Sequence, residues 1–416
     1  MNTIIKNGLL VLIILLGVIP VYSGGFQVNE HGARATGMAG AVYATLNDAS
    51  AVHFNPGALS FMDGTHIMFG TTLIFPKGKF RGPFPSVDQT DMESPMSYPS
   101  VFYASHTLSN GLAFGFGMFN PYGSGTKWPD NWVGRNLAME SSLRTFFFNP
   151  TVSYRVTDYM GIAVGFNYVY SDIDLQQGVS FEPTFAGNGD VRLTGSGSGI
   201  GWNIGLYTNI TPEFSAGLAF RSGVGLDLEG DAEYTDIPRQ IGEAGLLPGD
   251  KIEASVTLPA NLFAGIAYTG IDKLTIGLGF QYVFWSSVEE IALTFTDTGN
   301  EDALVFNYVN SYIARIGFEY QVNSDLAVRA GYLFDKNPTP DEYMRPGIPD
   351  ADRHGFTLGV GYQINDKIGV DFGYLFIRFN ERRIENSNVE YKTGARMNGV
   401  YNVSGHLPSI NFKFNL

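Results

Sequence analysis

The sequence has no cysteine, and only 16% of its 416 residues are charged. Without cysteine no disulfide can form, and the lipid attachment that a lipoprotein receives on a cysteine after its signal peptide is excluded. Basic residues are scarce as well, because 26 Lys and Arg stand against 40 Asp and Glu. The formal net charge of −14 argues against nucleic acid as a partner. Beyond the N-terminus no apolar run approaches the ~20 residues that a spanning helix needs, so a helical membrane protein is excluded.

Aromatic residues and glycine, in contrast, are abundant, with 32 Phe, 22 Tyr and 51 Gly. This composition fits a protein whose outer wall faces lipid. The N-terminus has the form of a Sec signal peptide, with Lys6 as the positive flank, an apolar core over 8–19 and a cleavage site at 21–23. We therefore expect residues 1–23 to be removed on export.

From residue 65 onward, segments alternate apolar with small or polar side chains, which is the signature of transmembrane β-strands. Over 274–284, for example, Leu, Ile, Phe and Tyr share one face, while Thr, Gly and Gln share the other. The pattern predicts fourteen strands near residues 65–76, 97–108, 111–120, 142–156, 159–173, 194–210, 213–228, 252–269, 273–289, 304–321, 325–335, 352–364, 367–383 and 403–416.

The connections between these strands alternate strictly between six tight turns and seven long loops. Short periplasmic turns and long extracellular loops give this alternation, and they place both ends of the barrel in the periplasm. A soluble β-sandwich would instead present polar outward faces. We therefore predict an all-β fold, a 14-stranded antiparallel transmembrane β-barrel over residues 65–416, in the outer membrane of a Gram-negative cell.

Residues 24–64 are rich in Gly and Ala and show no strand alternation. We interpret this segment as an N-terminal hatch of short helices that plugs the lumen. Several charged residues fall on the inward side of the predicted strands, as expected if a charge facing lipid at the midplane costs on the order of 2–4 kcal/mol. They should pair with one another or with the hatch, the alternative being direct contact with a ligand. These residues are Arg155, Arg221, Arg315, Glu319, Arg329, Asp371 and Lys413.

No catalytic constellation stands out in the sequence. The six histidines are scattered without the spacing of metal ligands, so we predict no catalytic residue, no metal and no cofactor. Two loop tryptophans, Trp128 and Trp132, are interpreted as interfacial anchors, with the lining of a surface groove as the alternative.

The third predicted strand ends in an irregular stretch, Asn120-Pro121-Tyr122-Gly123. Proline cannot donate to a strand ladder and glycine marks a bend, so pairing with a neighbouring strand should fail here. The stretch is either the plain start of a loop or a gap in the barrel wall.

Four stretches resemble the outer-membrane transporters of long-chain fatty acids and aromatic hydrocarbons in Gram-negative bacteria. They are residues 25–30 (GFQVNE), 55–58 (NPGA), 120–123 (NPYG) and 348–353 (IPDADR), and the resemblance extends over the whole mature chain. It implies a fourteen-stranded barrel with a hatch in its lumen, a monomer, and no enzymatic activity. The implied partners are a hydrophobic small-molecule ligand and the surrounding outer-membrane lipid and lipopolysaccharide.

The resemblance also implies roles for individual residues. Ligand would pass from the extracellular loops to a pocket that Phe26 occupies or closes, and Asn55 and Pro56 would fix the hatch backbone. Gly57 departs from the family, which usually has Ala at this position. A rearrangement of the hatch would then release the ligand sideways through an opening in the wall. The opening would be formed by Asn120, Pro121, Tyr122 and Gly123.

The residues near the ligand head group differ from those of fatty-acid transporters. Those relatives carry basic residues at two positions that fall at Gln177 and Val309 here. A buried carboxylate without charged partners is unfavourable, so the resemblance suggests an uncharged ligand such as an alkane or aromatic hydrocarbon. Arg192 or Arg315 could instead compensate for the missing charges.

Two other functions compete with passive uptake. A structural or adhesive barrel could bind partners through acidic extracellular loops. Such a barrel has no use for a hatch in its lumen, or for an aromatic residue placed near the start of that hatch. An outer-membrane enzyme would need a nucleophile, a base and oxyanion donors in one place. The predicted function is therefore passive uptake of hydrophobic small molecules.

Overall fold

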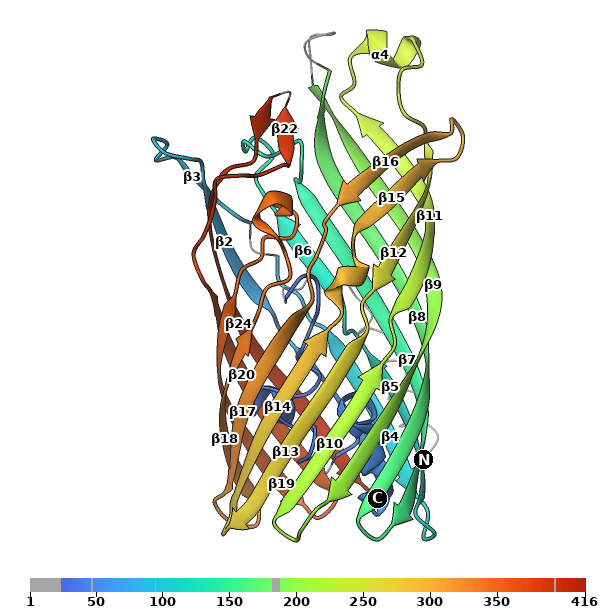
Figure 1. Ribbon diagram of the computed structural model, residues 1–416, viewed down its shortest axis with the longest axis vertical. Coiled ribbons are helices and arrows are strands. Elements are labelled where there is room, and N and C mark those ends of the chain that lie inside the picture. The colour runs from blue at the N-terminus through green and yellow to red at the C-terminus, as the bar shows by residue number, and fades with distance from the viewer. Residues whose placement is uncertain (1–23, 46–47, 94, 182–187, 393) are drawn as a thin grey trace, which may run out of the picture.

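The computed structural model describes residues 24–45, 48–93, 95–181, 188–392 and 394–416. The predicted signal peptide, residues 1–23, lies outside these ranges. Figure 1 shows a tall barrel that holds the blue N-terminal segment in its lower half and carries long loops and hairpins above its upper end. Among the described residues, no helix is long and apolar enough to cross a membrane.

The strands form one closed antiparallel barrel of fourteen strands, which confirms the predicted fold. The seam lies where β1 pairs with β24, with Ile67 opposite Phe414. Interrupted strands carry two labels. In chain order the wall consists of β1 (Gly64–Thr72) with β2 (Phe75–Arg81), β4 (Ser100–Thr107), β5 (Leu112–Phe119) with β6 (Gly123–Lys127), β7 (Glu140–Thr157), β8 (Met160–Ser180), β9 (Asn188–Asn209), β10 (Phe214–Arg221) with β11 (Val224–Thr235), β12 (Lys251–Leu258) with β13 (Asn261–Ile271), β14 (Leu274–Val283) with β15 (Glu290–Phe295), β16 (Asn300–Val305) with β17 (Ser311–Gln321), β18 (Leu326–Asp335), β19 (Arg353–Asn365), β20 (Ile368–Phe379) with β21 (Arg382–Ile384), and β24 (Gly399–Asn415).

Of the remaining short elements, η2 (Trp285–Ser287) lies at the break between β14 and β15, and the others lie in the loops at the upper end. These are β3 (Gln89–Asp91), α4 (Arg239–Glu243), η3 (Asp341–Tyr343), β22 (Glu390–Lys392) and β23 (Ala395–Arg396). The tight turns lie at the opposite end, so the upper end in Figure 1 is the extracellular one.

The alternating sequence pattern places large apolar side chains on the outside of the barrel. On β14, Leu278 and Phe280 are 50% and 44% exposed, whereas Gly277 and Gly279 face the hatch. Exposed Phe, Leu, Ile, Val and Tyr recur in the same way on most of the wall strands. Such a surface is stable against the hydrocarbon of a bilayer, which explains why the alternation is so regular.

The hatch fills the lumen with three short helices, α2 (Ala33–Gly37), α3 (Ala51–Phe54) and the 3-10 helix η1 (Pro56–Phe61). Inward glycines of the wall let the hatch backbone approach closely. A Cβ added at Gly217 would lie 2.1 Å from Tyr43 O, and one added at Gly277 would lie 2.1 Å from Ala41 O. Similar close contacts occur at Gly317, Gly359 and Gly373. The hatch is therefore packed against the wall as tightly as a protein core.

The inward charges pair with one another and with the hatch, as predicted. Glu319 accepts hydrogen bonds from Arg34 of α2 at 2.9 Å and from Arg329 at 2.5 Å. Arg329 also contacts Asp371 at 2.8 Å, and Asp371 contacts Lys413 at 2.7 Å. The other three arginines donate to hatch carbonyl oxygens, Arg155 to Ser60, Arg221 to His53 and Arg315 to Ala39.

Four neighbouring strands are interrupted at one level above the hatch. The breaks separate β10 from β11, β12 from β13, β14 from β15 and β16 from β17. Their register places them side by side, because Arg221 pairs with Asn261 and Asn261 pairs with Val283. At this level Trp285 and Tyr308 are buried, with ring centroids 5.5 Å apart. The interruptions thus bring aromatic side chains across the mouth of the barrel.

The interpretation of Trp128 and Trp132 as interfacial anchors was wrong. Both are buried, and their rings stack with centroids 4.5 Å apart. Their indole N–H groups donate to Pro346 O at 2.9 Å and Ala138 O at 2.8 Å. The extracellular loops fold over one another and supply these partners, which a local sequence pattern does not reveal.

Candidate ligand pocket and hatch

The segment that follows the predicted signal peptide is held at the barrel mouth. The Gly25 N–H donates to Asp350 Oδ2 at 2.9 Å, and Asp350 also accepts from Arg353 at 3.1 Å. Burial raises the pKa of the Asp350 carboxyl above its usual value. Phe26 is 2% exposed, and its ring meets Trp285 edge-on with centroids 4.8 Å apart. Two of the sequence motifs, 25–30 and 348–353, therefore meet in the fold.

The third strand loses its neighbour in the wall where the sequence predicts. β4 and β5 pair only as far as Phe102 and Met118, and β6 continues beside β7, with a single bridge from its last residue, Lys127, to Glu93 on its other side. On the other side, residues 121–123 pair with residues 26–28 through two backbone hydrogen bonds of 2.9 and 2.8 Å. The N-terminal segment thus takes the place of a neighbouring strand.

The pairing of residues 26–28 with residues 121–123 forms a junction between the hatch and the third strand. Tyr122 connects this junction to the opposite side of the barrel wall. Its hydroxyl donates to Pro259 O and accepts from Asn261 Nδ2, each at 2.6 Å. The Gln27 side chain donates to Asn261 Oδ1 at 3.0 Å, so both partners of the junction reach the same asparagine. Residues 120–123 are all buried. The junction is therefore closed in this structure.

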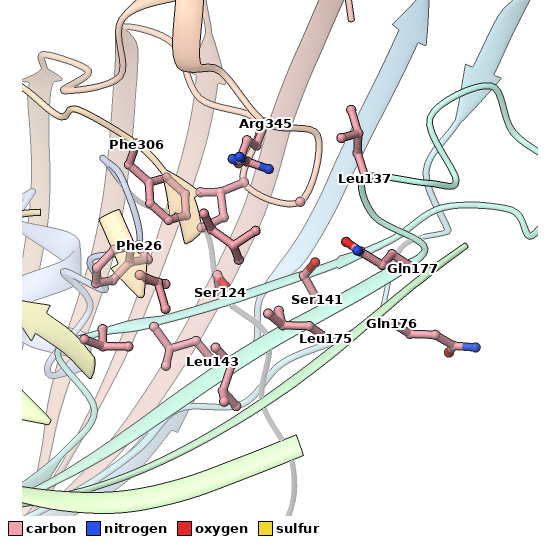
Figure 2. Close-up of a pocket in the computed structure, with 16 residues that line it drawn as sticks. Phe26, Ser124, Leu137, Ser141, Leu143, Leu175, Gln176, Gln177, Phe306 and Arg345 are labelled. Atoms are coloured by element: carbon pink, nitrogen blue, oxygen red, sulfur yellow. The ribbon is translucent and has the colours of Figure 1, made fainter. Parts of the chain in front are cut away.

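A pocket lies beside Phe26 at the barrel mouth. Its cavity volume is about 70 Å³, and the empty space between its walls amounts to about 720 Å³ when the part open to solvent is included. Figure 2 shows Arg345 and Phe306 on one side of the space and Leu143 and Leu175 on the other. The apolar lining includes Phe26, Leu143, Leu175, Ile291, Leu304 and Phe306, and the polar lining consists of Ser124, Ser141, Gln176, Gln177 and Arg345. An apolar wall with few polar groups is the usual composition of a small-molecule site.

Arg345 brings a positive charge into this pocket. Its Nε donates to Val305 O at 3.3 Å, its guanidinium lies 5.9 Å from the Phe306 ring centroid, and it forms no ion pair with any described residue. Burial lowers the pKa of Arg345 below its usual value. Sequence patterns did not single it out, because a lone arginine in the acidic loop 341–352 does not reveal where that loop folds.

The four residues considered for the ligand head group do not gather in one place. Gln177 lines the pocket. Arg192 lies on the outward side of β9, where it pairs with Asp174 at 2.6 Å, and Val309 is 54% exposed in a loop. Arg315 lies in the lumen and is held by hydrogen bonds to the hatch and to the wall. Of the four, Gln177 alone reaches the pocket.

Asn55 fastens the hatch to the wall, away from the pocket. Its Oδ1 accepts from the Gly57 N–H at 3.2 Å, and its Nδ2 donates to Tyr43 O and Leu206 O at 3.0 Å each. Pro56 takes the first position of η1, where a backbone N–H is not needed. These residues shape the hatch and do not line the pocket.

Gly57 is wedged against the backbone of β8 and β9, and this leads to a prediction. A Cβ at this position would lie 2.9 Å from both Gly161 O and Tyr207 N. We expect Gly57→Ala to destabilise the hatch by about 1–3 kcal/mol, because overpacking forces the backbone to shift. Hydrogen exchange of hatch amides should rise, while Gly242→Ala, with nothing within 4 Å, should change nothing. Unchanged protection of the hatch would contradict the prediction.

The fold and these contacts define a class of protein, a transmembrane barrel plugged by its own N-terminal segment. Residues 15–416 match the model of the family described as Outer membrane protein transport protein (OMPP1/FadL/TodX), and the chain belongs to this family. It is therefore a transport protein of the Gram-negative outer membrane and not an enzyme.

Individual relatives agree with this assignment. The Long-chain fatty acid transport protein of Escherichia coli K12 is 23% identical over 393 residues, which cover 85% of this chain and 87% of that protein. The crystal structure of a Pseudomonas aeruginosa FadL homologue superposes with a TM-score of 0.85 at 21% identity, over 94% of this chain and 99% of that one. The Pseudomonas putida toluene transporter TodX gives 0.72 at 18% identity, over 95% and 100%. These structures show the same fold.

Proposed function

We propose that this protein carries hydrophobic small molecules, long-chain fatty acids or hydrocarbons, passively across the outer membrane. The observation that carries the proposal is the apolar pocket that borders Phe26, the residue that pairs with the interrupted third strand. An apolar ligand gains roughly 0.8 kcal/mol for each CH₂ that it buries, so an apolar pocket suits it better than an aqueous pore. The names of the relatives, a fatty acid transporter and a toluene transporter, agree with this ligand class.

We propose further that the ligand leaves sideways through the wall at residues 120–123. The wall lacks its usual strand pairing at this point, and residues 26–28 cover it through two backbone hydrogen bonds. A rearrangement of the hatch that breaks these two bonds and the side-chain hydrogen bonds of Gln27 and Tyr122 would open a path without separating two paired strands. Lateral exit delivers an apolar ligand into lipid and avoids its return to water.

The polar lining of the pocket bears on the charge of the ligand. Gln177 and Val309 lack the positive charges that fatty-acid transporters carry at their positions, which favours an uncharged ligand. Arg345 favours a carboxylate, because this partly buried cation feels the Asp302 carboxylate but forms no ion pair with any described residue, and therefore gains from a charged acceptor in contact with it. We propose a carboxylate ligand, since Arg345 lines the pocket and Val309 does not.

Uptake into liposomes tests the proposed function. We expect liposomes that contain the folded barrel to take up labelled oleate or labelled toluene faster than liposomes with an unrelated barrel of similar size. Heat-modifiable migration in gels verifies that the barrel is folded. Failure to take up either compound in a folded barrel would contradict the proposal.

A further inference from the structure

The apolar outer surface of the barrel ends at a row of basic side chains near the seam. Along β1 and β2 the outward positions change from apolar to basic in the extracellular direction. On β20 the outward positions also change from apolar to basic, at Arg378, and Ser404 of β24 stands between the two strands in the same row, paired with Lys77 on one side and with Arg378 on the other. The outward sequence on the first strand reads Ile67, Phe69, Thr71, Leu73, Phe75, Lys77, Lys79 and Arg81.

A second row lies further toward the extracellular end. Val400 pairs with Arg81 on one side and with Arg383 on the other. Outward residues two apart on a strand are separated by roughly 7 Å and residues two strands apart by about 10 Å, so the cations form one patch. We call this patch the basic belt, and it consists of Lys77, Lys79, Arg81, Arg378 and Arg383.

Most of the basic belt lacks a counter-ion within the described ranges. Lys79 lies 3.7 Å from Asp91, with both side chains more than half exposed, and the other four cations form no ion pair. Two further carboxylates lie nearby. Glu381 contacts Asn402 at 3.4 Å, and Glu385 shares a surface hollow with Arg81 and Arg383. A chain with a net charge of −14 thus gathers unpaired positive charge at one place on its outer face.

The position of the basic belt identifies its ligand chemistry. Directly below it, Phe75 and Phe376 flank His406 in one row, and the Tyr374 hydroxyl lies 2.7 Å from His406 Nδ1. Aromatic side chains of this kind mark the boundary between hydrocarbon and head groups. Cations just outside that boundary, on the extracellular side, face the phosphate groups of the outer leaflet. Lys and Arg are the side chains that bind such phosphates.

We propose that the basic belt binds the phosphorylated head group of lipopolysaccharide in the outer leaflet. The lipid would lie against the seam strands, with its acyl chains on the apolar surface below and its phosphates among the cations. An acidic protein partner fits less well, because the belt begins at the membrane border and continues the lipid-facing side of the same strands.

Lipid enrichment around the barrel tests the proposal. The mature protein is placed in phosphatidylcholine nanodiscs with fluorescent lipid A that carries two phosphates, or with the same lipid after removal of its phosphates. We expect enrichment of the phosphorylated lipid next to the barrel and its loss at high salt. The variant Lys77→Gln, Arg81→Gln, Arg378→Gln, Arg383→Gln should reduce this enrichment about tenfold.

A second variant with the same change of charge provides the control. It carries Arg239→Gln, Lys251→Gln, Lys273→Gln and Lys367→Gln, all at exposed positions outside the basic belt, and it should retain the enrichment. Equal enrichment in the belt variant and the unmodified protein would overturn the proposal. So would equal enrichment of the lipid without phosphates, or an equal loss in the control variant.

Discussion

A disulfide between residues 27 and 122 should abolish transport, and reduction should restore it. Gln27 and Tyr122 form an isolated antiparallel bridge between the hatch and the third strand. The backbone hydrogen bonds flank this pair, so its Cα atoms are expected about 4.5 Å apart, within the range that a disulfide spans. Because the chain has no other cysteine, Gln27→Cys with Tyr122→Cys can form this cross-link alone.

The cross-linked protein serves as its own control. If residues 26–28 must separate from residues 121–123 to open the wall, the oxidised form should show no measurable uptake of oleate, and dithiothreitol should return it to the rate of the reduced form. The single variants Gln27→Cys and Tyr122→Cys should be insensitive to oxidation. Transport by the oxidised form at the reduced rate would show that the ligand takes another path.

Replacing Arg345 with glutamine should weaken the binding of a long-chain fatty acid and leave its methyl ester unaffected. Arg345 lines the pocket, and it forms no ion pair with the described residues. A hydrogen bond to a charged group is worth about 1.5–3 kcal/mol, so Arg345→Gln should weaken acid binding on the order of 10- to 100-fold. Displacement of a fluorescent fatty acid from the purified barrel measures both ligands.

The comparison with the ester separates charge from packing. Arg239→Gln changes the same residue type in the exposed helix α4 and should leave both affinities unchanged. An equal loss for acid and ester would mean that Arg345 acts through packing against Phe306. A preference of the unmodified protein for the ester would favour the uncharged ligand instead.

The fold could be predicted because lipid and lumen impose opposite demands on successive residues. On β14, Leu278 and Phe280 face the lipid, and the inward-facing glycines beside them leave room for the hatch. The need for apolar residues outside and small residues inside is therefore visible within one short segment of sequence. The break at Pro121 could be predicted for a similar reason, since proline lacks the donor that a ladder requires. The family resemblance pointed to Phe26, which is among the residues that line the candidate pocket.

The rest of the site depends on contacts between distant loops. Arg345 and Trp285 reach the pocket region because the loops and interrupted strands fold inward over the mouth. The predicted strands over 252–269 and 273–289 were continuous, whereas the structure breaks both near Pro259 and Trp285. The break near Pro259 falls on a residue without the ladder donor. The break near Trp285 accompanies the packing of this ring against Phe26 and Tyr308, and alternation along one strand carries no trace of that packing.

The close fit between hatch and wall constrains the assembly of the barrel in the membrane. The hatch backbone touches glycines on several wall strands, and Arg34 joins the ion pairs that link Glu319, Arg329 and Asp371. The pairing of β1 with β24 closes the wall around this segment. We therefore expect the folding of the hatch and the closure of the seam to depend on each other.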